Sequence, residues 1–272
     1  ILKDADAVSI VVPTDRHYEI AKQCLERGCD VLIEKPMTEK IWQAEELIHI
    51  AKSKGAILQV GHLERFNSAI REASRFLSDP LFIECHRLHS FVERGAEVDV
   101  ILDLMIHDLD IILSLVRSPV VRIDAVGTPV LSPHVDIASV RLTFESGCVA
   151  NVTASRISFS AIRKIRIFQP SAYVSIDFQN SSVDICRAGH PEAEGRRISA
   201  ERLSFAKRDA LSEEISAFME SVKRRTPPLV GGLEAIEALK LADQIGDQIR
   251  ERIKKTGSRI SRGLGQKTWY ES

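Results

Sequence analysis

Residues 8–36 read VSIVVPTDRHYEIAKQCLERGCDVLIEKP, and this stretch decides the fold. It opens with a β-branched run, Val8–Val12, which predicts a strand buried on both faces. A helix to about Arg27 follows, and Gly28 suits the position just after a helix end. A second apolar run at residues 30–33 predicts a parallel neighbour, because a strand, a helix and a strand joined by short connections form a βαβ unit.

The same alternation continues once more. Residues 38–54 predict a helix closed by Gly55, and residues 56–60 predict a third strand that ends at Gly61-His62. We therefore expect the C-terminal part of a doubly wound, Rossmann-type parallel sheet. A complete dinucleotide-binding sheet has about six strands, yet the chain contains no GxGxxG and starts at Ile1 without Met. We expect the phosphate-binding half to lie upstream.

The pattern changes after residue 62. A helix is predicted near residues 65–77, an apolar helix at Val98–Leu115, and two closing helices near 211–223 and 233–253. Between them, β-rich runs and turn signals predict an α+β domain with a large, mostly antiparallel sheet. These runs are residues 82–88, 120–126, 138–144, 148–154, 163–168, 172–177 and 182–186. The predicted organisation is residues 1–62, residues 63–253 and a polar tail at 254–272.

Composition excludes several classes of partner. The 37 Lys and Arg residues balance the 38 Asp and Glu residues, so charge gives no reason to expect nucleic acid or a membrane surface. No apolar run approaches the ~20 residues of a membrane-spanning helix. The five cysteines are odd in number and widely spaced, without a CxxC pair. This usage argues against a disulfide framework or a structural zinc site and favours a reduced, cytoplasmic setting.

All three predicted parallel strands end in residues suited to a ligand site. Ligands of open α/β sheets bind outside the carboxyl ends of the strands, which here are Pro13-Thr14, Glu34-Lys35-Pro36 and Gly61-His62. Pro36 restricts the backbone of Lys35, so the lysine could orient a hydroxyl or a nicotinamide. The alternative is a solvated turn that carries a charged pair.

The apolar helix carries polar residues at helical spacing. Asp99, Asp103, His107 and Asp110 recur at i, i+4, i+8 and i+11, which predicts one stripe facing a cleft. We expect Asp103 to raise the pKa of His107 and to orient its ring for proton transfer. One alternative is a set of satisfied core polar groups. A metal site is another, although the spacing offers no third ligand.

His62 and Arg65 follow the third strand and are candidates for contact with substrate or cofactor. The alternative is a helix entrance that Asn67 or Glu64 caps. His17, near the start of the first helix, fits first-turn packing better than a ligand contact.

These motifs resemble the glucose–fructose oxidoreductase, inositol dehydrogenase and MocA family over nearly the whole chain. They are VVPTDRH and VLIEKP, then VGHLERFN, then DLMIHDLD. The resemblance implies a Rossmann domain that binds NAD or NADP, a small-molecule sugar or nucleotide-sugar substrate, and a homodimer or homotetramer built by an open, largely antiparallel sheet. NAD is the expected cofactor, with NADP as the alternative.

The resemblance also implies residue roles. Lys35 matches the catalytic lysine of the Glu-Lys-Pro motif. Asp103 and His107 match an Asp and a His that face the substrate, with His107 as the acid/base. The positions implied to line the dinucleotide are Pro13, Thr14, His17, Glu34 and Lys35. No metal ligand is implied.

The motifs GHLERFN and DLMIHD are most similar to those of a bacterial subgroup that oxidises the 3-hydroxyl of UDP-N-acetylglucosamine. In that subgroup the oxidation precedes transamination on the way to lipid A. The alternatives are an inositol or aldose dehydrogenase, a non-catalytic sensor or scaffold, and a truncated inactive product. Because the glycine-rich loop is absent, we expect this chain alone to bind the cofactor poorly or not at all.

Overall fold

The computed structural model describes residues 5–92, 98–188, 198–205 and 209–263. The residues around the unusual start at Ile1 and the end of the predicted tail, residues 264–272, lie outside this description. No helix within the described ranges combines the length and apolar character needed to cross a membrane.

A parallel sheet forms the N-terminal layer, in the order β1-β2-β3. The strands are β1 (Ala7–Ile10), β2 (Asp30–Glu34) and β3 (Leu58–Gly61), and the helices between them are α1 (His17–Glu26) and α2 (Ile41–Lys54). Gly28 and Gly55 follow the two helices with φ of 79° and 63°, conformations that glycine adopts without strain. The Rossmann-type βαβαβ arrangement predicted from the sequence is therefore present.

Strand β1 differs from its prediction in one respect. Ser9, Val11 and Val12 are exposed, so the run at 8–12 is not buried on both faces. The reason is that β1 is the edge of this sheet and its pairing ends at Ile10, so Val11 and Val12 lie beyond the paired residues.

The second sheet has the order β11-β10-β9-β8-β4-β7-β6-β5. It is antiparallel except for the pair β4–β7, where Phe82 lies opposite Val149. Its strands are β4 (Phe82–Leu88), β5 (Val120–Thr128), β6 (Ile137–Phe144), β7 (Val149–Ser155), β8 (Ile162–Gln169), β9 (Ala172–Asp177), β10 (Ser182–Ala188) and β11 (Ile198–Ser204). Strand β11 was not predicted, because its side chains are almost all exposed and show no apolar alternation.

The remaining helices pack around the two sheets. They are α3 (Ser68–Ala73), α4 (Ile106–Val116), α5 (Ala210–Arg224) and α6 (Gly232–Gly263). Asn67 caps α3 by accepting a hydrogen bond from the backbone N–H of Ala69 at 3.0 Å. Helix α6 continues to Gly263, so residues 254–263 extend the helix where the sequence predicted the start of a polar tail.

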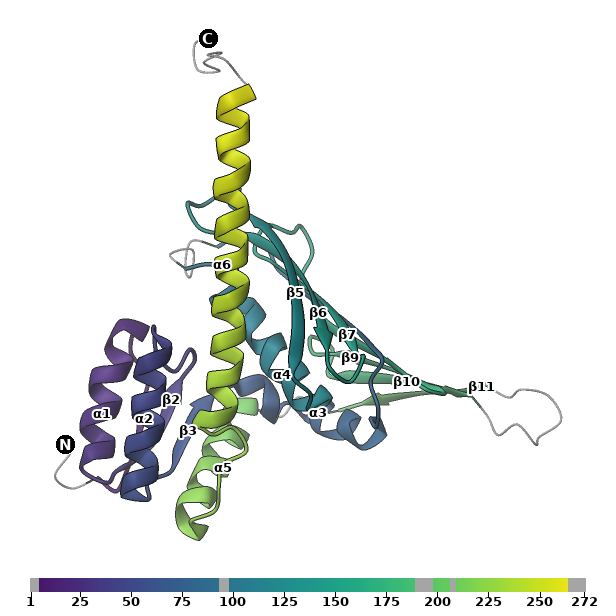
Figure 1. Cartoon of the computed structure of the whole chain (residues 1–272). Coiled ribbons are helices and arrows are strands. Elements are labelled where there is room, and N and C mark those ends of the chain that lie inside the picture. The colour runs from purple at the N-terminus through teal and green to yellow at the C-terminus, as the bar shows by residue number, and fades with distance from the viewer. Residues whose placement is uncertain (1–4, 93–97, 189–197, 206–208, 264–272) are drawn as a thin grey trace.

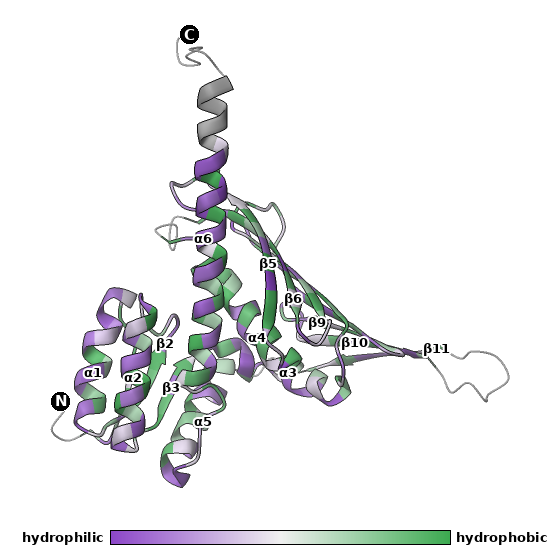
Figure 2. Ribbon diagram, viewed as in Figure 1, coloured by the Kyte–Doolittle hydropathy of each residue, from purple (hydrophilic) through white to green (hydrophobic). Residues whose placement is uncertain are grey.

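Helix α6 joins the two layers. It stands between the α1–α2 layer and the large sheet (Figure 1), and hydrophobic and hydrophilic residues alternate along it (Figure 2). Ala235 and Leu239 belong to the core of the parallel sheet, whereas Ala242 and Ile245 belong to the core of the large sheet. If the chain is divided at residue 62, part of the hydrophobic core of the parallel sheet therefore comes from residues 63–253.

The apolar helix predicted at 98–115 is not one α-helix. Residues Ile101–Met105 form a π-helical turn, and α4 begins only at Ile106. A π turn holds more residues than an α turn, so it rotates the preceding residues around the axis. Asp99 therefore leaves the predicted stripe and contacts the backbone N–H of Val135 at 2.9 Å and Arg250 at 3.2 Å.

Candidate active site

The ends of β1 and β2 are held together by His17. Its ring is buried, with Nδ1 2.9 Å from the carbonyl oxygen of Pro36 and Nε2 2.9 Å from that of Val12. The Lys35–Pro36 peptide bond is cis. His17 thus packs inside the first helical turn and fixes the two loops that carry the other candidate residues, while Pro13 and Thr14 lie at the more exposed end of β1.

Lys35 reaches from the end of β2 to the π turn. Its Nζ donates a hydrogen bond to the backbone carbonyl of Asp103 at 2.6 Å and lies 3.7 Å from the Asp103 carboxylate. Burial lowers the pKa of Lys35, and the carboxylates of Asp103 and Glu34 offset part of that effect. The lysine is therefore a positioned cation at a strand end, as the sequence predicted, and not a solvated turn.

His107 differs from its prediction. Burial, followed by the cations Lys35 and Arg87, lowers its pKa well below the ordinary value. The expectation that Asp103 would raise this pKa was wrong, because the Asp103 carboxylate pairs with Lys35. Among the described residues, His107 Nδ1 is buried without a hydrogen-bond partner. An imidazole with a lowered pKa is neutral at neutral pH, and one of its two ring nitrogens can then accept a proton.

A buried ion network lies behind these residues, and sequence reasoning missed it. Arg87 on β4 donates to both carboxylate oxygens of Asp108, at 2.9 and 2.7 Å, and to Glu64 at 2.9 Å. Arg87 and Asp108 are almost fully buried. A signal was available, because Arg87 shares the inward face of β4 with the core residues Ile83 and Cys85. A charge on an apolar strand face needs a partner.

His62 and Arg65 converge on Asp110. His62 Nδ1 lies 3.9 Å from the Asp110 carboxylate, and Arg65 donates to the same group at 3.4 Å. The rings of His62 and His107 meet edge to face, with centroids 6.3 Å apart. His62 is only 2% exposed, so the structure brings it to His107 and Asp110 in the interior.

Another buried carboxyl group, that of Glu214 on α5, lies close enough to Glu34 at the end of β2 to feel its charge. Its Oε1 has no hydrogen-bond partner in the described part of the chain, and its backbone carbonyl accepts from the buried amide of Gln59 at 3.2 Å. Burial, and then the nearby carboxylate of Glu34, raise the pKa of Glu214 from 4.5 to about 7.

This raised pKa predicts a loss of stability with rising pH. The unfolded chain releases the Glu214 proton near pH 4.5 and the folded chain only near pH 7, so stability falls across that window. The shift corresponds to roughly 3 kcal/mol. We expect Glu214→Gln to stabilise the protein at pH 8 but not at pH 4.5, as measured by urea unfolding. Glu220→Gln on the exposed face of α5 is the control, and an equal effect of both substitutions would contradict the assignment.

The strand ends fit the nicotinamide part of a dinucleotide. Val11 and Val12 expose apolar surface at the end of β1. At the end of β2, Lys35 is close enough for its charge to lower the pKa of His107. At the end of β3, a Cβ on Gly61 would lie 3.1 Å from Glu34 Oε2, so this backbone passes close to the carboxylate. The strand ends therefore carry both exposed apolar side chains and charged groups.

Neither metal-ligand clusters nor disulfides contribute to the site in the described residues. No group of three or more His, Cys, Asp or Glu side chains there is arranged to hold a metal ion. All five cysteines are unpaired, and four of them are buried.

Comparison with known proteins agrees with this geometry. Residues 1–62 match the model of an oxidoreductase family with an NAD-binding Rossmann fold, and residues 69–169 match the GFO/IDH/MocA C-terminal domain. A UDP-N-acetylglucosamine 3-dehydrogenase of Acidithiobacillus ferrooxidans is 36% identical over 90% of this chain and 79% of its own length. The chain belongs to the GFO/IDH/MocA family. It is an NAD-binding oxidoreductase, and its relatives include sugar dehydrogenases that act on CH–OH groups.

A solved structure and a second relative extend the comparison of this GFO/IDH/MocA member. The solved structure of the Acidithiobacillus ferrooxidans UDP-N-acetylglucosamine 3-dehydrogenase superimposes with a TM-score of 0.86 at 35% identity, covering 91% of this chain and 80% of that one. A scyllo-inositol 2-dehydrogenase (NAD(+)) of Bacillus subtilis is 28% identical over 56% of this chain and 49% of its own length.

Proposed function

We propose that this oxidoreductase oxidises a hydroxyl group on the sugar ring of a nucleotide sugar to a ketone, with NAD as the acceptor. The substrate we propose is UDP-N-acetylglucosamine, oxidised at its 3-hydroxyl. The observation that carries the proposal is that Lys35 is held at the end of β2 by Asp103, one helical turn from His107, whose pKa burial and the charge of Lys35 lower. The similarity to the UDP-N-acetylglucosamine 3-dehydrogenase supports the choice of substrate.

The residues divide the work of removing the hydroxyl proton. His107 accepts this proton at a ring nitrogen, which is the role of a general base. Lys35 donates a hydrogen bond to the same oxygen and stabilises the negative charge that develops there. Asp103 holds Lys35 in place through its carbonyl and carboxylate oxygens. When bound, NAD supplies the acceptor for the hydrogen and electron pair that leave the carbinol carbon.

The cofactor would lie along the ends of β1 and β2. Pro13, Thr14 and Glu34 would hold it, and Lys35 would stand where cofactor and substrate meet. His17 would act indirectly, because both of its ring nitrogens contact backbone carbonyls of the two loops.

The proposal extends to assembly and location. A homodimer or homotetramer is supported by the face of the large sheet turned away from the helices, where Phe82, Phe168 and Tyr173 pack side by side with centroids 5.6 and 5.0 Å apart. The unpaired cysteines suit the reducing cytoplasm. A 3-keto nucleotide sugar made there could be transaminated on the way to lipid A.

The direct test follows reduced nicotinamide by its absorbance. The protein would be incubated with NAD and UDP-N-acetylglucosamine, with a ketone trap to draw the reaction forward. We expect formation of reduced nicotinamide with this substrate and little with scyllo-inositol or free glucose. Activity with scyllo-inositol but not with UDP-N-acetylglucosamine would show that the proposed substrate is wrong and that an inositol is oxidised instead. Inactivity with every sugar would contradict the proposed function.

A further inference from the structure

A row of polar side chains links the candidate base to a cavity elsewhere in the protein. Asp103, His107, Asp110 and Ser114 follow one another at spacings of four, three and four residues, which places them on one face of the π turn and α4. Asp110 and Ser114 line a cavity of about 840 Å³ between α4 and α6. Lys35 and His107 are not among the residues that line this cavity.

His62 fills the interval between His107 and Asp110. Its ring meets the His107 ring edge to face, with centroids 6.3 Å apart, and its Nδ1 lies 3.9 Å from the Asp110 carboxylate. In the described residues, the Nδ1 atoms of both histidines are buried without a hydrogen-bond partner. Buried polar atoms rarely lack partners, and an unpartnered ring nitrogen on each of two touching histidines marks a path that a proton or one water molecule can use.

We propose that His62 and Asp110 carry the proton that His107 takes from the substrate to the water of this cavity. The inference rests on the proposed function, because an alcohol oxidation releases one proton for each turnover. The C–H and O–H bonds of the carbinol break and a C=O bond forms. The hydrogen leaves with its electron pair for NAD, and the hydroxyl proton passes to His107, then to His62, Asp110 and water.

The surrounding charges favour this direction. Burial lowers the pKa of His107 and of His62, so neither ring holds a proton for long. Burial raises the pKa of Asp110, so its carboxylate accepts a proton more readily than an exposed one, although His62 and Arg65 oppose this shift. The charged and titratable groups that act on the three residues are Lys35, Arg87, Arg163, Arg65 and Glu234. The cations around His107 repel an emerging proton, whereas Asp110 attracts it.

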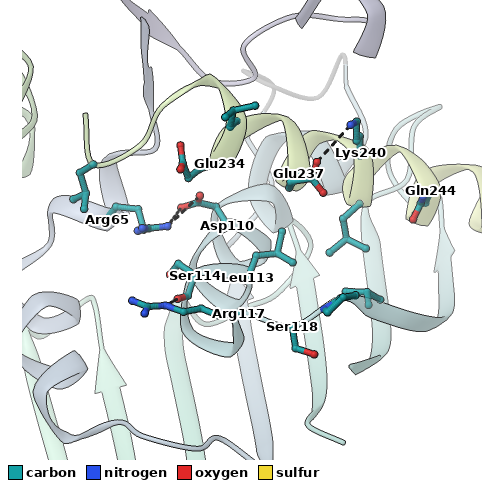
Figure 3. A pocket seen from close by; sticks show the side chains of 15 residues that line it. Arg65, Asp110, Leu113, Ser114, Arg117, Ser118, Glu234, Glu237, Lys240 and Gln244 are labelled. Atoms are coloured by element: carbon teal, nitrogen blue, oxygen red, sulfur yellow. Dashed lines mark hydrogen bonds and ion pairs between the residues drawn. The ribbon is translucent and has the colours of Figure 1, made fainter. Parts of the chain in front are cut away.

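The exit side of the path is visible in Figure 3. Arg65 donates to Asp110 from one side, and Glu234 on α6 lies beside the same carboxylate. The 3.9 Å between His62 and Asp110 is longer than a direct hydrogen bond. A bridging water or a small ring rotation closes such a gap. Arg65 and Asp110 both line the cavity, so the path ends at its wall.

The first test measures turnover and its response to buffer. His62→Phe keeps an aromatic ring but cannot carry a proton, and Asp110→Asn keeps the shape of the carboxylate. We expect each to lower kcat at low buffer concentration by about 10²-fold, with KM unchanged and with partial recovery on addition of imidazole. His134→Gln is the matched control, because His134 lies 3.9 Å from Asp99 outside this row. Unchanged kcat, or a loss that imidazole does not relieve, would overturn the relay.

The second test does not require activity. In protein labelled with ¹⁵N-histidine, exchange of the His62 ring proton with water can be followed by NMR. Because His62 is buried, we expect Asp110→Asn to slow this exchange about tenfold, and His134→Gln to leave it unchanged. If Asp110→Asn slows the exchange but the unsubstituted protein oxidises no sugar, the proposed function is refuted and the proton path is supported. Oxidation with exchange unaffected by Asp110→Asn would refute the path alone.

Discussion

Replacement of His107 by alanine is expected to lower turnover of the sugar by about 10²–10⁴-fold, the usual contribution of a general base. The imidazole is neutral because burial and Lys35 lower its pKa, so it can accept the hydroxyl proton at neutral pH. Alanine removes the acceptor and leaves the strand ends unchanged. Binding of NAD is therefore expected to persist, and kcat from absorbance of reduced nicotinamide can be compared with NAD affinity from calorimetry.

His89→Ala provides the control for this substitution. His89 is a partly exposed histidine whose Nδ1 contacts the carbonyl oxygen of Ser90 at 2.7 Å, and its loss is expected to leave turnover unchanged. Retention of most of the turnover by His107→Ala would show that another group is the base. Loss of NAD affinity together with turnover would instead assign His107 to cofactor binding.

The parallel layer could be predicted because its signals are local. Each strand from Ala7 to Gly61 is a short apolar run, and Gly28 and Gly55 mark the two helix ends. The pairing order of the large sheet could not be predicted, because it depends on contacts between distant segments. An example is the parallel pair in which Phe82 lies opposite Val149.

The sequence indicated the candidate residues but not their pairing or their electrostatics. Strand ends and a polar helix face are visible in the sequence, whereas the contact of Lys35 with Asp103 is seen only in the structure. The π turn at Ile101–Met105 was not visible, and it turns Asp99 away from the row. The low pKa of His107 depends on burial and on cations from distant segments, which spacing along one helix cannot reveal.

Arg87 is expected to be the residue in this network whose loss most reduces stability. It is buried between Asp108 and Glu64, and its three hydrogen bonds satisfy their carboxylates at 2.7–2.9 Å. Arg87→Met would leave Asp108 as a buried charge without its partner. Breaking a buried ion pair from one side costs about 3–5 kcal/mol, so the free energy of unfolding in urea should fall by that amount.

Two further variants separate this effect from the loss of any strand arginine. Arg166→Met removes an ion pair with Glu84 on the open face of the same sheet, where both side chains are partly exposed, and should cost no more than about 1 kcal/mol. Arg87→Met combined with Asp108→Leu removes both buried charges and should recover much of the lost stability, which also covers the case in which the single variant fails to fold. Equal costs for Arg87→Met and Arg166→Met, or no recovery in the double variant, would show that the network behind His107 does not depend on the pairing of these charges.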